Sequence, residues 1–440
     1  MKNYAMEKAL ESAETSSMWS SPSPPPSDPL SPHVTVNTTT HPSPLKYPPK
    51  DFFASGALND PLDDWLLSSV ASRALPDFLP PGVRAPAFAD PFALVDEEMA
   101  SLSGEIVQLL GSDHPVLEQV ARYFFELDSG KKVRPVMVLL MSHALQSSGT
   151  ASPAPSLPPT PPSRTAASRG SRAPILETQR RLAEISEMIH TASLFHDDVI
   201  DKSDTRRGVP SINKTFGNKL AILAGDFLLA RASICLARLR DVEVVEVMSA
   251  IIEHLVKGEV MQMKVLRLSQ EEGASNSAVM EYYLKKNFYK TASLMANSCM
   301  AAAILNSHPP AQVRAAYLYG KHIGCAFQLI DDVLDFEGGI ATTGKPALAD
   351  LQLGISTAPV LFAAERRPEL YEMIERKFEG PGDVDAAAAM IRDSDGLERT
   401  KLLAQVHAER AVEELMAEVE ESEYRDALVH LAHKVLTRKS

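Results

Sequence analysis

The sequence predicts an all-α protein, built as one large helical bundle around a central cavity. From Asp96 onward, apolar residues recur every three or four positions, whereas no segment alternates with the period of two that indicates a strand. Short breakers such as His308-Pro309-Pro310 and Gly380-Pro381-Gly382 separate these stripes. A hydrophobic content of 45% is enough for a large core.

Composition excludes several classes of function. The net charge of −13 argues against a nucleic-acid partner. No uninterrupted apolar run reaches the roughly 18 residues of a membrane-spanning helix, so we expect no membrane span. The three cysteines, Cys235, Cys299 and Cys325, lie in apolar stretches as small buried side chains. Their spacing fits neither a zinc site nor a disulfide framework.

The N-terminal part differs from the rest in composition. Residues 1–90 are rich in proline and serine and are expected to be disordered. Residues 91–440 are expected to form one all-α domain, with a mobile Ser/Pro/Ala-rich insertion at about 147–174. A mitochondrial leader is normally rich in arginine and poor in acid. Here the first arginine is Arg73, and Glu7, Glu11 and Glu14 precede it.

The apolar pattern predicts a series of helices along the chain. The first begins near Asp96 and carries apolar residues at helical spacing: Val95, Met99, Leu102, Ile106, Leu109 and Leu110. Next comes a basic segment, Gly130 to Pro135, which leads into an apolar helix containing His143. Residues 177–196 form one helix that ends at an acidic motif, and a second acidic motif follows an apolar run at Gly324.

The two acidic motifs carry the chemistry. Asp197, Asp198 and Asp201 form one Asp-Asp-x-x-Asp pattern, and Asp331, Asp332 and Asp335 form the other. Residues i, i+1 and i+4 of a helix turn their carboxylates toward one face, where like charges repel. Divalent cations shared with a diphosphate would relieve that repulsion. A solvated acidic face is the alternative, but each motif continues an apolar run, and unpaired buried carboxylates are costly.

With Arg206-Arg207, these motifs resemble the aspartate-rich motifs of the trans-polyprenyl diphosphate synthases, particularly the long-chain type of ubiquinone side-chain synthesis. The resemblance runs from about residue 90 to the C-terminus. It implies a Mg²⁺-dependent prenyltransferase that joins isopentenyl diphosphate head to tail to an allylic diphosphate. The implied product is a long all-trans polyprenyl diphosphate, hexaprenyl to decaprenyl. It also implies a mitochondrial location, with the cytoplasm as the alternative given the leader, and a homodimer, with a heteromer left open. A peripheral membrane contact would serve product release.

The resemblance also assigns residues. The catalytic set comprises Asp197, Asp201, Arg206, Lys290 and Asp331. The metal ligands are Asp197, Asp198, Asp201, Asp331 and Asp335, with Asp332 acting indirectly. The allylic diphosphate would be bound by Arg206, Lys290, Thr291, Gln328 and Lys345, and isopentenyl diphosphate by Lys131, Arg134, His143 and Arg207. His143 could instead be a buried histidine with its hydrogen bonds satisfied. Glu259 and Gln262 are either cavity wall or helix–helix contacts.

Product length depends on the helix before Asp197. Ser193 and Ala192, four and five positions upstream, are small and leave the path below the metal site open, with Met188 and Ile189 one turn deeper. A helix of about 20 residues is long enough to line a tunnel for around six to ten isoprene units. The sequence therefore predicts a long product.

Three other functions stay open. A class I terpene cyclase shares the first motif, but its second is normally of the Asn/Asp-Ser/Thr-Glu type. A non-catalytic subunit of a heteromeric synthase should have lost acidic or basic site residues. The same reaction could also make a shorter product in specialised metabolism.

Overall fold

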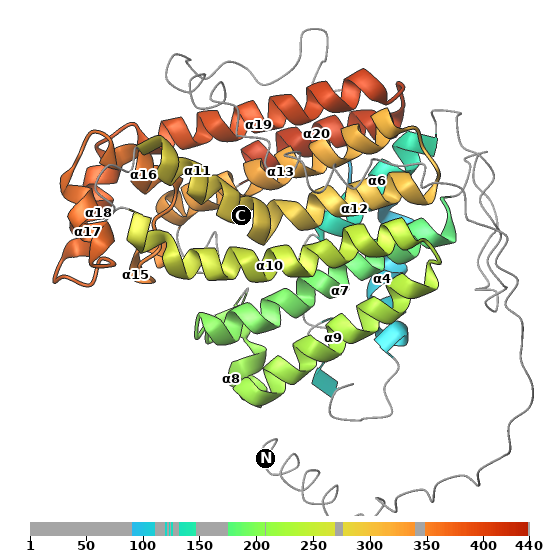
Figure 1. The fold of residues 1–440 in the computed structure, drawn as a ribbon, viewed down its shortest axis with the longest axis horizontal. Coiled ribbons are helices and arrows are strands. Elements are labelled where there is room, and N and C mark those ends of the chain that lie inside the picture. Colours follow the sequence, from blue (N-terminus) through green and yellow to red (C-terminus); the bar gives the residue numbers. More distant parts are fainter. Residues whose placement is uncertain are drawn as a thin grey trace, which may run out of the picture. The chain divides into compact units, whose positions relative to one another are not determined.

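The computed structural model describes residues 90–110, 119–120, 123, 125, 132–146, 175–206, 208–268, 276–338 and 348–438 (Figure 1). The longer helices are α4 (Asp96–Leu110), α6 (Val133–Gln146), α7 (Glu177–Ile200), α9 (Asn218–Arg238), α10 (Val242–Leu268), α11 (Asn276–Asn287), α12 (Ser293–Leu305), α13 (Pro310–Glu337), α19 (Gly396–Glu418) and α20 (Glu423–Thr437). Shorter helices are η2 (Ala93–Val95), α8 (Ile212–Phe216), α15 (Ala349–Gln352), α16 (Ala358–Ala364), α17 (Glu369–Glu375) and α18 (Asp383–Arg392). The five-residue segment η3 (Phe288–Ala292) is a π-helix between α11 and α12.

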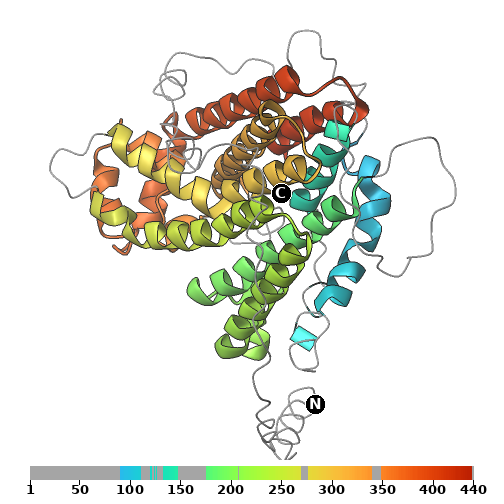
Figure 2. The ribbon, with the colours of Figure 1, turned by 45° about the vertical axis from the view of Figure 1, so that its right-hand side comes forward.

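The long helices pack as a bundle, which confirms the predicted all-α fold. The second-motif helix α13 lies between α12 and α19, while α7 packs against α6, α9 and α12. α10 contacts α11 and α12 and runs alongside α7 in the view of Figure 1. Figure 2 shows α6 and α4 on the other side of α7. The two acidic motifs thus lie on two long helices, α7 and α13, that both pack against α12.

The centre of the bundle is α12. Every residue from Ser293 to Leu305 is buried, as expected of a helix that is apolar on all sides and has neighbours all round it. The segment just before α12, η3, lies close against α13, and this contact requires Gly324, because a Cβ there would lie 2.4 Å from the Cα of Ala292. A larger residue would push α13, and the acidic motif at its end, away from η3.

Strand structure in the described part of the chain is confined to a two-residue hairpin that the sequence did not predict. β1 (Thr205–Arg206) pairs with β2 (Val209–Pro210) antiparallel, with Arg206 opposite Val209. Two residues are too short to show alternation. The three cysteines are free and buried, as predicted.

One helix among the described residues, α9, is long and apolar enough to cross a membrane by length and composition alone. Core helices of soluble proteins pass the same test, so a single helix is weak evidence for a span. Fewer than half of the residues in its most apolar stretch are buried here.

Candidate active site

The first acidic motif ends α7. The helix stops where Lys202 adopts a left-handed conformation (φ 52°), so the chain turns away directly after Asp201. Asp201 lines a cavity, whereas Asp198 is buried and accepts hydrogen bonds from Arg206 Nε (3.0 Å) and Nη2 (2.6 Å). Asp198 and Arg206, predicted as ligands of metal and diphosphate, therefore bind each other in this structure.

Lys290 brings a cation to this motif from η3. A π-helical turn displaces side chains from normal helical register and is frequent at functional sites. Gly258 of α10 allows the approach, since a Cβ there would lie 3.0 Å from the Lys290 amide nitrogen. The Lys290 ammonium contacts Glu259 Oε2 at 2.5 Å and donates to Gln262 Oε1 at 3.1 Å. Glu259 and Gln262 thus line the cavity described below, and they also connect α10 to η3 through Lys290.

Asp197 lies within electrostatic range of this group. Burial raises the pKa of Asp197 to about 6, an effect that Lys290 opposes and that the neighbouring carboxylates of Glu259 and Asp201 reinforce. Like-charged neighbours disfavour the ionised form of Asp197, and a bound cation would relieve that repulsion.

The second motif is held by a different set of contacts. Asp332 is buried and accepts hydrogen bonds from the hydroxyl of Tyr283 and from Gln328 Nε2, the latter at 3.0 Å. Asp335 accepts from the backbone nitrogens of Ala349 (3.0 Å) and Asp350 (3.2 Å) at the start of α15. These bonds fix the turn of α13 from which the motif projects.

Asp331 is paired with an arginine from the other end of the sequence. Arg438, just past α20, donates to the Asp331 carboxylate and to the carbonyl oxygen of Phe327 (2.8 Å), and its guanidinium lies 3.7 Å from the centre of the Phe327 ring. Asp331 remains 43% exposed, so its carboxylate can still reach a ligand. Arg438 was not predicted from the sequence, because 107 residues separate the two partners.

Adjacent residues link the two motifs. Lys290 faces the first motif, whereas the hydroxyl of Thr291 donates to Gln328 Oε1 at 2.8 Å, and Gln328 in turn binds Asp332 of the second motif. Lys290 thus acts on the first acidic motif through its charge, and Thr291 is linked to the second through Gln328.

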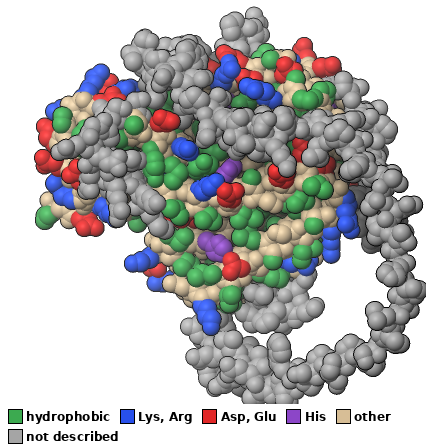
Figure 3. All heavy atoms as spheres, in the orientation of Figure 1, with side chains coloured by type: hydrophobic (Ala, Val, Ile, Leu, Met, Phe, Trp, Pro, Cys, Tyr) green, Lys and Arg blue, Asp and Glu red, His purple; other side chains and the backbone are tan. Residues whose placement is uncertain are grey.

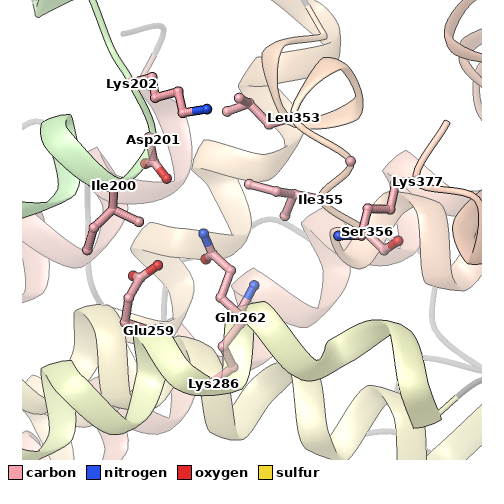
Figure 4. Close-up of a pocket in the computed structure, with 11 residues that line it drawn as sticks. Ile200, Asp201, Lys202, Glu259, Gln262, Lys286, Leu353, Ile355, Ser356 and Lys377 are labelled. Carbon is pink, nitrogen blue, oxygen red and sulfur yellow. The ribbon is translucent and has the colours of Figure 1, made fainter. Parts of the chain in front are cut away.

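A cavity of about 490 Å³ opens beside this junction (Figure 4). Asp201 enters it from α7, Glu259 and Gln262 from α10, and Lys286 from α11. Its remaining lining comes from Ile200, Lys202, Leu353, Gly354, Ile355, Ser356 and Lys377. The cavity combines carboxylates with ammonium groups, a composition suited to a metal–diphosphate complex.

The predicted isopentenyl diphosphate pocket needs a correction at its histidine. His143 is buried; its Nε2 lies 3.0 Å from Glu98 of α4, and its ring stacks on Tyr424 at 4.4 Å. The histidine beside Arg134 is instead His190, with Nη1 to Nε2 at 3.0 Å. His190 lies two helical turns before Asp197, so its position on α7 could have indicated it. The sequence was wrong to place His143 in the pocket, because packing against α4 and α20 turns it away.

Three predicted site residues, Lys131, Arg207 and Lys345, lie outside the described residues. Of the predicted chain-length residues, Met188, Ile189 and Ala192 are fully buried along α7, while Ser193 is partly exposed and bonds to its own helix at the His190 carbonyl. Their influence on product length stays a prediction.

In the part of the chain that the structure describes, no three His, Cys, Asp or Glu side chains converge as a ready metal-binding cluster. The donors nevertheless fit a hard divalent ion, because Asp197, Asp201 and Asp331 offer only carboxylate oxygens. Mg²⁺ normally keeps several waters and takes further oxygens from a bound diphosphate, so a preformed three-ligand cluster is not required.

Comparison with known proteins places the chain among related sequences. The polyprenyl synthetase family matches residues 114–391. A probable mitochondrial hexaprenyl pyrophosphate synthase of Yarrowia lipolytica is 47% identical over 79% of this chain and 85% of its own length. The mitochondrial hexaprenyl pyrophosphate synthase of Saccharomyces cerevisiae is 39% identical over 80% of this chain and 91% of its own. Among solved structures, a Caulobacter crescentus polyprenyl synthase complexed with calcium and isoprenyl diphosphate superposes with a TM-score of 0.67, at 29% identity, over 80% of this chain and 97% of that one.

Proposed function

The chain belongs to the polyprenyl synthetase family, and from that premise we propose that it elongates an allylic diphosphate with isopentenyl diphosphate into a long all-trans polyprenyl diphosphate. The observation that carries the proposal is the junction at Lys290-Thr291, where the Lys290 charge acts on Asp197 of the first acidic motif and Thr291 is linked through Gln328 to Asp332 of the second. We place the enzyme in the mitochondrion, in line with the names of its fungal relatives. We assign it to ubiquinone side-chain synthesis, as the resemblance of its motifs implies.

The chemical barrier is separation of charge. The allylic C–O bond breaks, diphosphate leaves with the electron pair, and the double bond of isopentenyl diphosphate attacks the resulting carbocation. Loss of one proton then restores a double bond. Fixed positive charge aimed at the leaving diphosphate is the main catalytic contribution that a protein can make here. Lys290 supplies such a charge. The hydrogen bond between Thr291 and Gln328 positions the Gln328 side chain, which in turn binds Asp332 on α13.

Mg²⁺ is the metal that we assign to the site. When bound, it polarises the diphosphate oxygens as a Lewis acid. Asp197, Asp201 and Asp331 would hold it, and Asp335 would contribute from the α15 side. Asp198 positions Arg206 through a bidentate bond, and Arg206 reaches diphosphate only by leaving or sharing that carboxylate.

Isopentenyl diphosphate requires its own basic pocket. Arg134 contacts His190, which lies two helical turns before Asp197 of the first motif. We assign both residues to this pocket, with Lys131 and Arg207. His190 occupies the role that the sequence gave to His143. A neutral imidazole beside a guanidinium can still donate one hydrogen bond to a phosphate oxygen.

A second copy of the chain is the partner that we propose for α9 and α10. These adjacent helices expose apolar side chains that a folded monomer would normally bury, including Leu223 (48% exposed) on α9 and Val256 (60% exposed) on α10. Figure 3 shows hydrophobic side chains gathered over this face. Light scattering of the wild type and of Leu223→Asp distinguishes a dimer from a monomer. If the variant remains a dimer, the interface does not lie on this face.

One assay separates this function from its rivals. The purified protein is incubated alone with Mg²⁺, farnesyl diphosphate and labelled isopentenyl diphosphate, and the dephosphorylated products are separated by chain length. We expect alcohols of six or more isoprene units. Cyclised hydrocarbon formed from the allylic substrate alone would indicate a terpene cyclase. Absence of any product would indicate a non-catalytic subunit, and a short product would favour specialised metabolism.

A further inference from the structure

Lys286 is a buried lysine that makes no direct ion pair within the described part of the chain. It is 5% exposed, and among the described residues its ammonium takes part in no hydrogen bond or ion pair. Its contact is with the ring of Tyr283, 5.0 Å from nitrogen to ring centre. Lysine is almost never this buried unless it is paired. Lys285, the preceding residue on the same helix, is exposed to solvent, as lysine side chains usually are.

The Lys286 side chain ends in the cavity of the active site. Figure 4 shows its ammonium beside Gln262, with Glu259 on the same wall and Asp201 entering from the opposite side. Lys202 and Lys377 also line the cavity. Lys286 precedes Lys290 by one helical turn, so two ammonium groups approach α10 from the same direction.

The acids near Lys286 are already occupied. Glu259 is bound to Lys290, and Asp332 accepts hydrogen bonds from Tyr283 and Gln328. Burial lowers the pKa of Lys286, and the Asp332 charge partly offsets this effect. A desolvated ammonium that faces a cavity without a partner is held ready for an anion that arrives there.

We propose that Lys286 is a further diphosphate-binding residue, whose ammonium binds the allylic diphosphate and the inorganic pyrophosphate that leaves from it. This inference rests on the proposed function for the identity of the anion. Its ammonium lies on the side of the cavity opposite Asp201. Lys290, which is bound to Glu259 of the cavity lining, adds a second ammonium group nearby. Because negative charge on the leaving group grows in the transition state, Lys286 affects turnover as well as binding.

The test compares Lys286→Met with the matched control Lys285→Met. Inorganic pyrophosphate is titrated into each full-length protein at saturating Mg²⁺ by calorimetry. We expect Lys286→Met to weaken pyrophosphate affinity about 10-fold to 100-fold, the loss typical of one hydrogen bond to a charged group. Lys285→Met should bind like wild type. The Tm of ligand-free Lys286→Met should equal or exceed that of wild type, because removing an unpaired buried charge costs no stability. Its kcat should fall more than its KM for the allylic substrate rises.

The opposite results have a clear meaning. If Lys286→Met binds pyrophosphate like wild type but has a lower Tm, Lys286 is a counter-charge for Asp332 and the proposal is wrong. Lys286→Gln is measured in parallel, so that a folding defect in one variant does not decide the outcome. If wild type makes no polyprenyl product yet loses pyrophosphate affinity on substitution of Lys286, the binding role stands and the proposed reaction fails. If product forms normally and affinity is unchanged, only the role of Lys286 fails.

Discussion

Replacement of Ala192 by phenylalanine tests whether α7 sets product length. Ala192 is fully buried on α7, five residues before Asp197. At 1.5 Å of rise per residue, those five residues put it about 7.5 Å below the metal-binding carboxylate. Each isoprene unit adds four chain bonds of about 1.5 Å, or about 5 Å when extended. A straight chain reaches this depth after about one and a half units, so an aromatic ring there should stop growth early, at two or three units.

The unmodified helix allows a much longer product. From Asp197 back to its first residue, Glu177, α7 spans about 30 Å, which corresponds to about six extended units. We therefore expect wild type to release hexaprenyl diphosphate or longer, and Ala192→Phe to release mainly farnesyl diphosphate.

The assay is chromatography of the dephosphorylated products with geranyl diphosphate as primer, so that short products stay visible. Ala192→Ser is the control, because it keeps a small side chain and should keep the wild-type length. Adding a ring to a packed interior costs about 1–3 kcal/mol, so the Tm of each variant is measured as well. Full-length product from a folded Ala192→Phe enzyme would refute the idea that this face of α7 borders the growing chain.

Three further changes have defined outcomes. Arg438→Ala frees the half-exposed Asp331 carboxylate from its ion pair and should lower the Mg²⁺ concentration for half-maximal activity about twofold to fivefold, measured by Mg²⁺ titration of turnover. Asp201→Asn should lower kcat by about a hundredfold or more at saturating Mg²⁺, because one of the carboxylates that would hold the metal beside the leaving diphosphate is lost. Burial, followed by a hydrogen bond to Glu105, raises the pKa of Glu184 to about 8, so its protonated form stabilises the fold fully below its unfolded pKa of 4.5. That stability is lost as pH rises through about 8, by roughly 2–4 kcal/mol, and Glu184→Gln, which stays neutral, should flatten the fall of Tm between pH 5 and pH 9.

Each of these expectations can fail in an identifiable way. A higher Mg²⁺ requirement in Arg438→Ala would mean that Arg438 contacts substrate rather than competing with metal. A wild-type kcat in Asp201→Asn would show that Asp201 does not bind the metal. An equal pH dependence of Tm in Glu184→Gln and wild type would mean that Glu184 is already ionised at neutral pH, held by Arg181 at 2.5 Å.

The parts of the site that the sequence could predict are those set by local spacing. Asp197 and Asp201 lie one turn apart on a helix, and so do Gln328 and Asp332, whatever the rest of the chain does. Fold class followed from periodicity for the same reason, because a stripe every three or four residues can be buried only by a helix. The separate boundaries at residues 90, 147 and 174 stay predictions.

Contacts between distant residues were decided by tertiary structure. Nothing in sequence distinguishes Lys286 from Lys285, yet one faces the cavity and the other solvent, because α11 presents a single face to α10 and α13. His190 rather than His143 meets Arg134, since the facing of each side chain depends on how α6 and α7 cross. Spacing along a helix fixes which residues share a face, but only packing fixes what that face meets.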